Sequence, residues 1–478
     1  MTDRTITSLS AIELSKLIHQ RTVSCEEVMR AYLQQIHHLN HHVNAIVSLQ
    51  DEEQLVQQAR NKDQQFHEVV SKGFLYGFPL APKDLAGTRG IPTTLGSPIF
   101  KNNIHAQDSI VVERMRASGG ILIGKTNVPE FGLGSHTYNQ LFGTTLNSYD
   151  QTKSAGGSSG GAAVALALHM LPIADGSDFG GSLRNPSAWN NVYGLRPSQG
   201  RVPSGTGMEV YYDQLPTDGP MARNVSDLAR MLAIHAGHDP RYPLSLQSPP
   251  AIYQQSLEAK MTGKRVGWLG DFGGYLPMEE GLLDQSTKSL TYFEAMGCIV
   301  EQVIPQFDMH QLWQAWLVLR AFVTGGKLMS LYQNPEQRTQ LKPEAIWEIE
   351  QSIALKASEV FQASVIRTAW TKELQRLFQT YDVLVLPSAQ VFAFDANQTW
   401  PKAIAGHGMD TYHHWMEVVF GPTLAGLPVL AIPAGFHQGV PFGLQVIGKP
   451  QGELELLQMG FAWEQATPFA QVKPSLIQ

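Results

Sequence analysis

The chain has 478 residues, of which 43% are hydrophobic and 16% are charged, and its formal net charge is −7. Disordered chains combine low hydrophobicity with high net charge, so this composition predicts a folded protein. Lys and Arg (35 residues) are scattered and are outnumbered by Asp and Glu (42 residues), which argues against direct nucleic-acid binding. The only two cysteines, Cys25 and Cys298, exclude a framework of disulfides.

Neither the N-terminus nor any apolar run predicts a membrane segment. Residues 1–4 lead into polar sequence without the apolar core of a signal peptide. The longest apolar run, residues 162–174, is interrupted by His169 and is shorter than the about 20 residues that span a bilayer. We therefore expect a cytoplasmic protein with no membrane partner.

The first 65 residues predict helices that pack on the rest of the protein. Ser24 and Glu27 form a capping box for one of them. Beyond residue 65, apolar strand candidates alternate with helical stretches. The strands are expected at 120–124, 264–269, 298–304, 382–386, 429–433 and 443–447, and the helices at 109–117, 224–236 and 279–296.

This alternation predicts an α/β fold with a central, mixed, twisted sheet that helices cover on both faces. No low-complexity linker divides the chain, and residues 240–250 look like a long surface loop. We therefore expect residues 1–478 to form a single large domain, although the length alone suggests about three.

Glycines are concentrated in two segments, 156–161 and 176–184, and the first leads into an apolar helical stretch. Neither segment ends in the Gly-Lys-Ser/Thr of a phosphate-binding loop, so a nucleotide cofactor is not expected. The sequence Gly156-Gly157-Ser158-Ser159-Gly160 matches the nucleophile elbow of α/β-hydrolases, which would make Ser158 the nucleophile of a serine esterase. Residues 147–154 are polar rather than strand-like, which weighs against this alternative.

Lys83 ends an apolar stretch that begins at Gly77. Its neighbours Leu80, Ala81 and Pro82 would partly desolvate the amine and lower its pKa, so that it could act as a base towards a serine. The alternative is a surface lysine whose stem lies along an apolar strand.

These segments, with Asn185-Pro186-Ser187-Ala188 and residues 194–202, resemble the amidase signature hydrolases. The spacings between the lysine and the two serine segments are similar to those of the family. Flanking segments agree as well, at 124–131, 218–223, 424–428 and 443–448. The resemblance covers nearly the whole chain and implies an amidase, in the fold of that family.

The resemblance implies a Ser-Ser-Lys catalytic triad. Ser182 is then the nucleophile that forms an acyl-enzyme. Ser158, which follows an unusual cis peptide bond in the family, relays the proton. Lys83 is the general base, neutral in the resting enzyme. In this interpretation Ser158 is not the nucleophile.

The second glycine segment also predicts an oxyanion hole. Backbone N–H groups of Phe179, Gly180, Gly181 and Ser182 can point at one position. Asp178 and Arg184 flank this segment and are expected to brace it through an ion pair or bonds to the backbone, unless they are ordinary surface charges.

Several other polar residues are assigned supporting or structural roles. Ser159 is expected to cap the following helix. His37, His38, His41 and His42 have the i,i+4 spacing of zinc ligands but no third ligand type, so we expect no metal. His413 and His414 are expected in a pocket wall or at the surface, and no cofactor is implied.

The substrate is predicted less directly. Candidate pocket residues are aromatic: Tyr138, Phe179, Trp189 and Trp415. They favour a small or medium aromatic or apolar amide. The alternative is the glutaminase (A) component of a glutamyl-tRNA amidotransferase. In that component an acidic residue binds the glutamine, and the corresponding position in this chain is Met416, with Glu417 next to it. A non-enzymatic binding protein is disfavoured because all three triad positions are occupied. The sequence leaves open whether the protein forms a homodimer.

Overall fold

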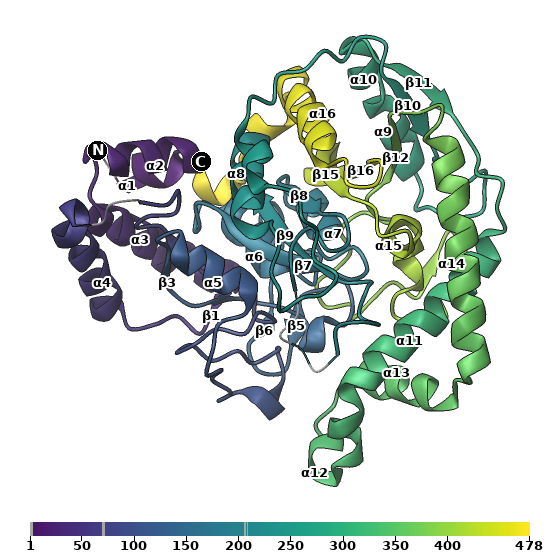
Figure 1. Cartoon of the computed structure of the whole chain (residues 1–478), viewed down its shortest axis with the longest axis horizontal. Helices are drawn as coiled ribbons and strands as arrows, with labels where there is room; N and C mark the ends of the chain where they lie inside the picture. The colour runs from purple at the N-terminus through teal and green to yellow at the C-terminus, as the bar shows by residue number, and fades with distance from the viewer. Residues whose placement is uncertain (1–2, 69–71, 205–206, 208) are drawn as a thin grey trace.

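The computed structural model describes residues 3–68, 72–204, 207 and 209–478, and a mixed sheet of eight strands lies at its centre (Figure 1). The strand order is β11-β10-β12-β16-β15-β8-β9-β7. β10 is parallel to both β11 and β12, whereas the remaining neighbours are antiparallel. The predicted mixed α/β fold is therefore confirmed. The strands of this sheet are β7 (Ala174–Asp178), β8 (Tyr193–Arg196), β9 (Thr217–Ala222), β10 (Arg265–Trp268), β11 (Ile299–Gln302), β12 (Val383–Pro387), β15 (Val429–His437) and β16 (Val440–Ile447).

In the described part of the chain, eight further strands, each of two residues, form pairs outside the main sheet. They are β1 (Ile46–Val47), β2 (Pro79–Leu80), β3 (Ile121–Leu122), β4 (Lys125–Thr126), β5 (Tyr138–Asn139), β6 (Gly143–Thr144), β13 (Ala403–Ile404) and β14 (His407–Gly408). The strand expected at 120–124 is β3, which pairs with β2 instead of joining the main sheet.

The strand predictions over 264–269, 298–304, 382–386, 429–433 and 443–447 are confirmed as β10, β11, β12, β15 and β16. β7, β8 and β9 were not predicted from the sequence. Their sequences, ADGSD, YGLR and TDGPMA, are rich in Gly, Asp and Pro, which strands generally avoid. β7 contains the start of the second glycine segment, and β8 and β9 are its neighbours in the sheet.

Both faces of the sheet are buried. In β12, Val383 and Val385 belong to one core cluster, and the alternate residues Leu384 and Leu386 belong to a second. Such alternation places one set on each face of the sheet. The expected burial of both faces is therefore confirmed.

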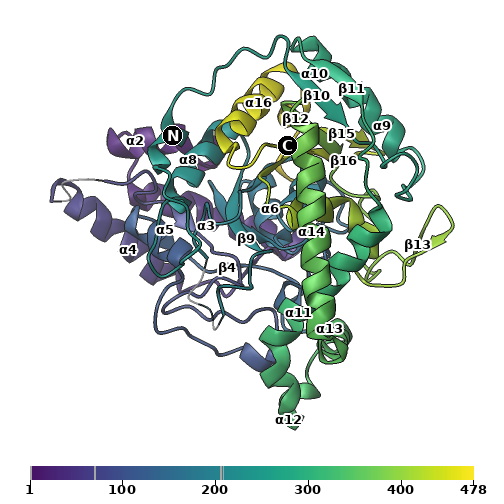
Figure 2. The same cartoon turned by 45° about the vertical axis from the view of Figure 1, so that its right-hand side comes forward.

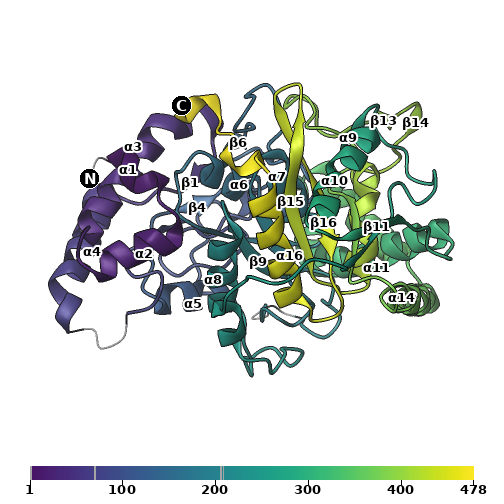
Figure 3. The ribbon, with the colours of Figure 1, turned by 90° about the horizontal axis from the view of Figure 1, so that it is seen from above.

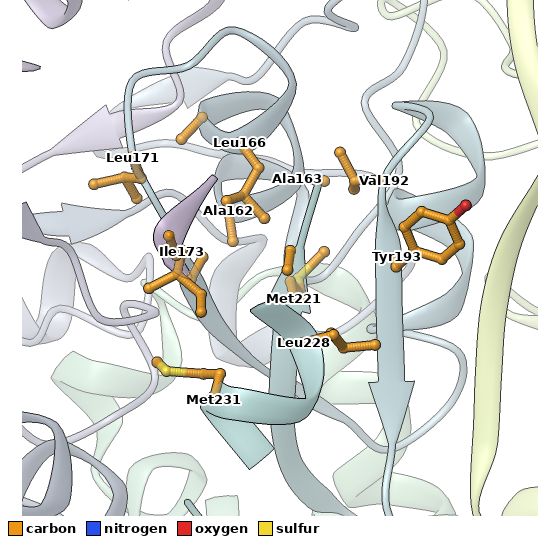
Figure 4. Packing of buried hydrophobic residues seen from close by; sticks show 14 of the residues in the cluster. Ala162, Ala163, Leu166, Leu171, Ile173, Val192, Tyr193, Met221, Leu228 and Met231 are labelled. Carbon is orange, nitrogen blue, oxygen red and sulfur yellow. The ribbon is translucent and has the colours of Figure 1, made fainter. Parts of the chain in front are cut away.

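The α-helices cover these two faces. Those of the structure are α1 (Asp3–Ser8), α2 (Ala11–His19), α3 (Cys25–Val43), α4 (Glu52–Gln64), α5 (Ile110–Ala117), α6 (Gly160–Ala167), α7 (Arg184–Trp189), α8 (Val225–His235), α9 (Leu282–Ser289), α10 (Thr291–Ala295), α11 (Met309–Gln333), α12 (Pro335–Arg338), α13 (Pro343–Ala354), α14 (Ala357–Leu377), α15 (Phe420–Leu424) and α16 (Glu453–Ala466). α8 and α16 contribute to the first core cluster, part of which is shown in Figure 4, whereas α7 and α15 contribute to the second. The helix expected over 279–296 is two helices, α9 and α10.

Two groups of helices lie at opposite ends of the molecule. The N-terminal helices α1–α4 lie on one side of the sheet region and α11 and α14 on the other (Figure 3). The backbone N–H groups of Ala11 and Ile12 donate to Asp227 on α8, which docks the N-terminal helices (2.7 and 2.9 Å). The capping box of Ser24 and Glu27 is confirmed. α14 crosses the front of the molecule in Figure 2.

No helix in the described part of the chain is both long and apolar enough to cross a bilayer.

Candidate active site

Lys83 is buried at the centre of a cluster of serines, with 1% of its surface exposed. Its Nζ lies 2.8 Å from the Oγ of Ser158 and 2.8 Å from the Oγ of Ser159. It also lies 2.9 Å from the carbonyl oxygen and 3.0 Å from the Oγ of Ser177. Lys83 follows β2 and bridges to Thr126 at the end of β4, so its backbone is held from two directions. The alternative of a surface lysine is wrong.

These surroundings suit a neutral amine. The pKa of Lys83 falls to about 7 because burial disfavours the ammonium, while Asp178, Asp218 and Asp175 act in the opposite direction. Of the four groups around Nζ, the carbonyl of Ser177 is the one that can only accept a hydrogen bond. The serine hydroxyls can either donate or accept, so one of them can donate to the lone pair of the neutral amine.

Ser158 and Ser159 lie immediately before α6. The Gly157–Ser158 peptide bond is cis, as the resemblance implies. Ser159 occupies the N-cap position, but its side chain makes no capping hydrogen bond, so the expected capping role is wrong. Its hydroxyl contacts Lys83 instead. The start of α6 is packed so tightly that a Cβ at Gly161 would overlap the amide of Asn127 and the carbonyl of Ala45.

The second glycine segment connects β7 to α7 and carries Ser182, which is 5% exposed. Gly181 has a φ of +91°, and a Cβ there would overlap the side chain of Asn185, so only glycine fits this turn. The N–H of Ser159 donates to the carbonyl of Ser182 at 3.3 Å. This contact joins the two glycine segments, which lie apart in the sequence.

Three of the four expected oxyanion donors have free amides. The N–H of Gly181 donates to Asp178 Oδ1 at 2.9 Å, which removes it from the expected set because the turn uses it internally. Across the described residues, the amides of Phe179, Gly180 and Ser182 have no hydrogen-bond acceptor. These three groups remain candidates to bind a developing oxyanion.

Asp178 and Arg184 form a fully buried ion pair behind this turn. Arg184 donates to both carboxylate oxygens of Asp178 (2.9 and 3.0 Å) and to Gln445 Oε1 on β16 (2.9 Å). A second arginine, Arg196, lies 3.6 Å from the same carboxylate. Burial alone would raise the pKa of Asp178, but the two arginines hold it well below its usual value. The carboxylate also accepts the N–H of Leu183 at 3.0 Å, so the pair fixes the turn that carries Ser182.

Two residues at the site were missed in the sequence. Ser177 and Asp175 alternate along β7, and both contact Lys83. Asp175 Oδ2 accepts the backbone N–H of Lys83 at 3.1 Å. Their spacing of two is the signal of a strand face, but it could not be recognised because β7 itself was not predicted.

A small pocket lies beside the first glycine segment. Its lining includes Tyr138 and Trp415, together with Ser135, Lys342 and Tyr412. The Ser135 hydroxyl donates to the carbonyl of Gly157 at 2.5 Å, which connects this pocket to the peptide bond preceding Ser158.

The two other predicted pocket residues lie elsewhere. Trp189 is not among the lining residues, because it stacks behind Trp415 in the core, with ring centroids 5.9 Å apart. Phe179 packs edge-on against Trp316 at 5.7 Å, and the guanidinium of Arg320 lies 4.9 Å from its ring.

Within the described residues, His413 and His414 make no hydrogen bond to Lys83 or to the serines around it. His413 is buried among aromatic rings, and burial lowers its pKa well below the usual value. His414 is partly exposed and contacts Asp410 at 2.6 Å. Within the described ranges, no three potential ligands gather as a metal site, and this applies to His37, His38, His41 and His42 as well.

Comparison with known proteins gives matches along most of the chain. The family model described as amidase matches residues 27–457. The A component of the glutamyl-tRNA(Gln) amidotransferase of Cyanothece sp. is 35% identical over 490 residues, which cover 96% of this chain and 99% of that protein. The acylamidase of Rhodococcus erythropolis is 31% identical over 480 residues, covering 99% of each.

Solved structures that match the chain include both of these kinds of relative. A bacterial aryl acylamidase of the amidase signature family superposes with a TM-score of 0.91 at 27% identity, and the match covers 98% of each chain. The A component of the glutamyl-tRNA(Gln) amidotransferase of Thermotoga maritima gives a TM-score of 0.79 at 26% identity and covers 98% of this chain and 96% of its own.

Proposed function

The chain belongs to the amidase signature family, and we propose that it is a free-standing amidase that hydrolyses a small-molecule carboxylic amide through an acyl-enzyme on Ser182. The observation that carries the proposal is the buried Lys83 amine, whose Nζ lies 2.8 Å from the Ser158 hydroxyl. Burial makes this amine a base near neutral pH, and a serine within hydrogen-bonding distance is its natural proton donor.

In the proposed reaction, neutral Lys83 takes a proton from Ser158, and Ser158 takes one from Ser182 as the Ser182 oxygen attacks the amide carbon. The N–H groups of Phe179, Gly180 and Ser182 stabilise the oxyanion, and each donor is typically worth about 3 kcal/mol. The tetrahedral intermediate collapses when Ser158 protonates the leaving amine and the Lys83 ammonium returns a proton to Ser158. Water then attacks the acyl-enzyme by the same route.

The substrate that we propose is a small or medium aromatic or apolar amide. Phe179, whose amide is one of the proposed oxyanion donors, is partly exposed, and the buried ring of Trp316 packs edge-on against its ring. The superposition on an aryl acylamidase, at a TM-score of 0.91, supports this assignment.

The second candidate is the glutaminase component of an amidotransferase, and the 35% identity to the Cyanothece protein favours it. Two features favour the free-standing amidase. Met416, at the position of the glutamine-binding acid, is apolar and buried. The neighbouring Glu417 already accepts a hydrogen bond from Tyr275 at 2.7 Å and faces His414 at 3.4 Å, so its carboxylate is engaged by the protein.

A labelling experiment tests the mechanism. The protein is treated with a fluorophosphonate, and the adduct is mapped by mass spectrometry. We expect the adduct on Ser182. An adduct on Ser158 would support the nucleophile-elbow alternative, and no adduct would contradict both serine mechanisms.

A substrate panel separates the two members of the family. Aryl, aliphatic and peptide amides are compared with glutamine, and kcat/KM is measured for each. We expect the aryl and apolar amides to have the highest values without any added protein. Glutaminase activity that appears only when the other amidotransferase components are added would contradict the free-standing amidase.

A further inference from the structure

Asp218 faces the Lys83 amine from the neighbouring strand. It lies on β9 directly opposite Ser177 on β7, in antiparallel register. Residues paired in this way project to the same face of a sheet. Because the Ser177 hydroxyl contacts Lys83 Nζ at 3.0 Å, the side chain of Asp218 points to the side of the sheet on which the amine lies.

The other carboxylates near Lys83 are already engaged. Asp178 is paired with Arg184 and Arg196. Asp175 accepts the backbone N–H of Lys83, and the nearby cation Lys125 also acts on it. The two arginines therefore compensate the charge of Asp178, whereas burial raises the pKa of Asp175 despite its bond to the Lys83 backbone.

Asp218 differs from them. Within the described residues its carboxylate accepts no hydrogen bond and has no ion pair. The remaining charged groups that act on it are Asp175, Asp213 and Lys327, and the last two are paired with each other at 2.5 Å. Asp218 is partly exposed, and the burial of its carboxylate together with the nearby Asp175 raises its pKa to about 7, while Lys83 opposes the shift.

We infer that Asp218 is a positioning residue for the proposed reaction, whose negative charge sets the pH at which Lys83 loses its proton. The inference rests on the proposed function, because it takes Lys83 as the base. A carboxylate beside an ammonium stabilises the charged form. Removal of this charge therefore lets Lys83 deprotonate at lower pH, and the acid limb of the reaction moves to lower pH.

The test measures the rate of fluorophosphonate reaction at Ser182 as a function of pH. It compares the wild type, Asp218→Asn, Asp218→Glu and the control Asp284→Asn, which removes an exposed carboxylate on α9. We expect the acid midpoint of Asp218→Asn to move down by about one pH unit. The midpoints of Asp218→Glu and Asp284→Asn should stay at the wild-type value.

Equal midpoints in Asp218→Asn and the wild type would overturn the inference while leaving the proposed function intact. Failure of the wild type to label at Ser182 at any pH would instead overturn the proposed function. Asp218→Ser removes the same charge with a smaller side chain, so it provides the same comparison if Asp218→Asn does not fold.

Discussion

A lysine amine in water keeps its proton up to about pH 10.4, and the Lys83 site changes this through burial among neutral hydroxyls. The amine meets three serine hydroxyls and one carbonyl within 3.0 Å and forms no direct ion pair among the described residues. Hydroxyls satisfy its hydrogen bonds without restoring the stability that water gives to an ammonium. Chemistry at this residue therefore depends on keeping it buried and on limiting the carboxylate charge around it.

We expect amide hydrolysis to increase as the pH rises through about 7, because Lys83, with its pKa lowered to about 7, becomes neutral there. Lys83→Ala should reduce kcat by about 10³-fold or more, as removal of a general base does. The measurement is kcat/KM against pH for the wild type and kcat for the variant.

His414→Gln serves as the control for this prediction, since the proposed mechanism uses no histidine. The variant should keep most of the activity and the same pH dependence. Loss of activity in a folded His414→Gln protein would contradict a histidine-free mechanism.

The buried ion pair of Asp178 and Arg184 makes a prediction about stability. Arg184→Met leaves the Asp178 carboxylate beside Arg196 alone and removes the bond to Gln445. Breaking a buried pair from one side costs about 3–5 kcal/mol, so the free energy of unfolding in denaturant should fall by that order. The matched control is Arg30→Ala, which breaks an exposed i,i+4 pair with Glu26 and should cost less than about 1 kcal/mol.

At the scale of elements, the site depends on the strands β7, β8 and β9, whose sequences are rich in Gly, Asp and Pro, and on the helix α6 in the first glycine segment. β7 and β9 place Asp175, Ser177 and Asp218 around Lys83. α6 begins directly after the two serines that contact the same amine. The position of each hydroxyl is therefore set by how closely α6 approaches its neighbours.

Gly161→Ala tests this close approach. The added Cβ would overlap the backbone of Asn127 and Ala45, and neither main chain can rotate away as a side chain can. We expect a loss of more than about 2 kcal/mol in the free energy of unfolding, of the size seen for overpacked cores, with loss of activity.

Gly326→Ala is the control for this prediction. It lies within α11, where no atom of the described residues stands within 4 Å of the added Cβ. This variant should be neutral or more stable by about 0.5–1 kcal/mol, because alanine favours the helix. A similar loss in both variants would show that the packing at α6 is not the cause.

At the scale of the whole molecule, the sheet separates two cores and brings distant parts of the chain to one site. Arg184 reaches Gln445 on β16 and the carbonyl of Val419, which are more than two hundred residues away in the sequence. The N-terminal helices dock on α8 through Asp227, and α11 supplies Trp316 beside Phe179. The second glycine segment is thus held by residues that lie far along the chain.

Much of this arrangement could be predicted from the sequence. Short apolar runs identified β10, β11, β12, β15 and β16, and the capping box identified the helix that starts after Ser24. The glycine segments and the apolar stretch before Lys83 marked the residues that the structure gathers. Local patterns are sufficient for these features because strand faces, caps and tight turns depend on residues within a few positions of one another.

Only the tertiary structure decided the roles of several neighbours. Ser159 contacts Lys83 instead of capping α6, the amide of Gly181 is engaged by Asp178, and Trp189 packs behind Trp415. The placement of Asp218 on the Lys83 side of the sheet depends on its register with Ser177. Each of these depends on contacts between segments far apart in the sequence, and the pKa of a buried group depends on all of its neighbours at once. The sequence by itself determined which residues could do the chemistry, and long-range packing decided which of them meet.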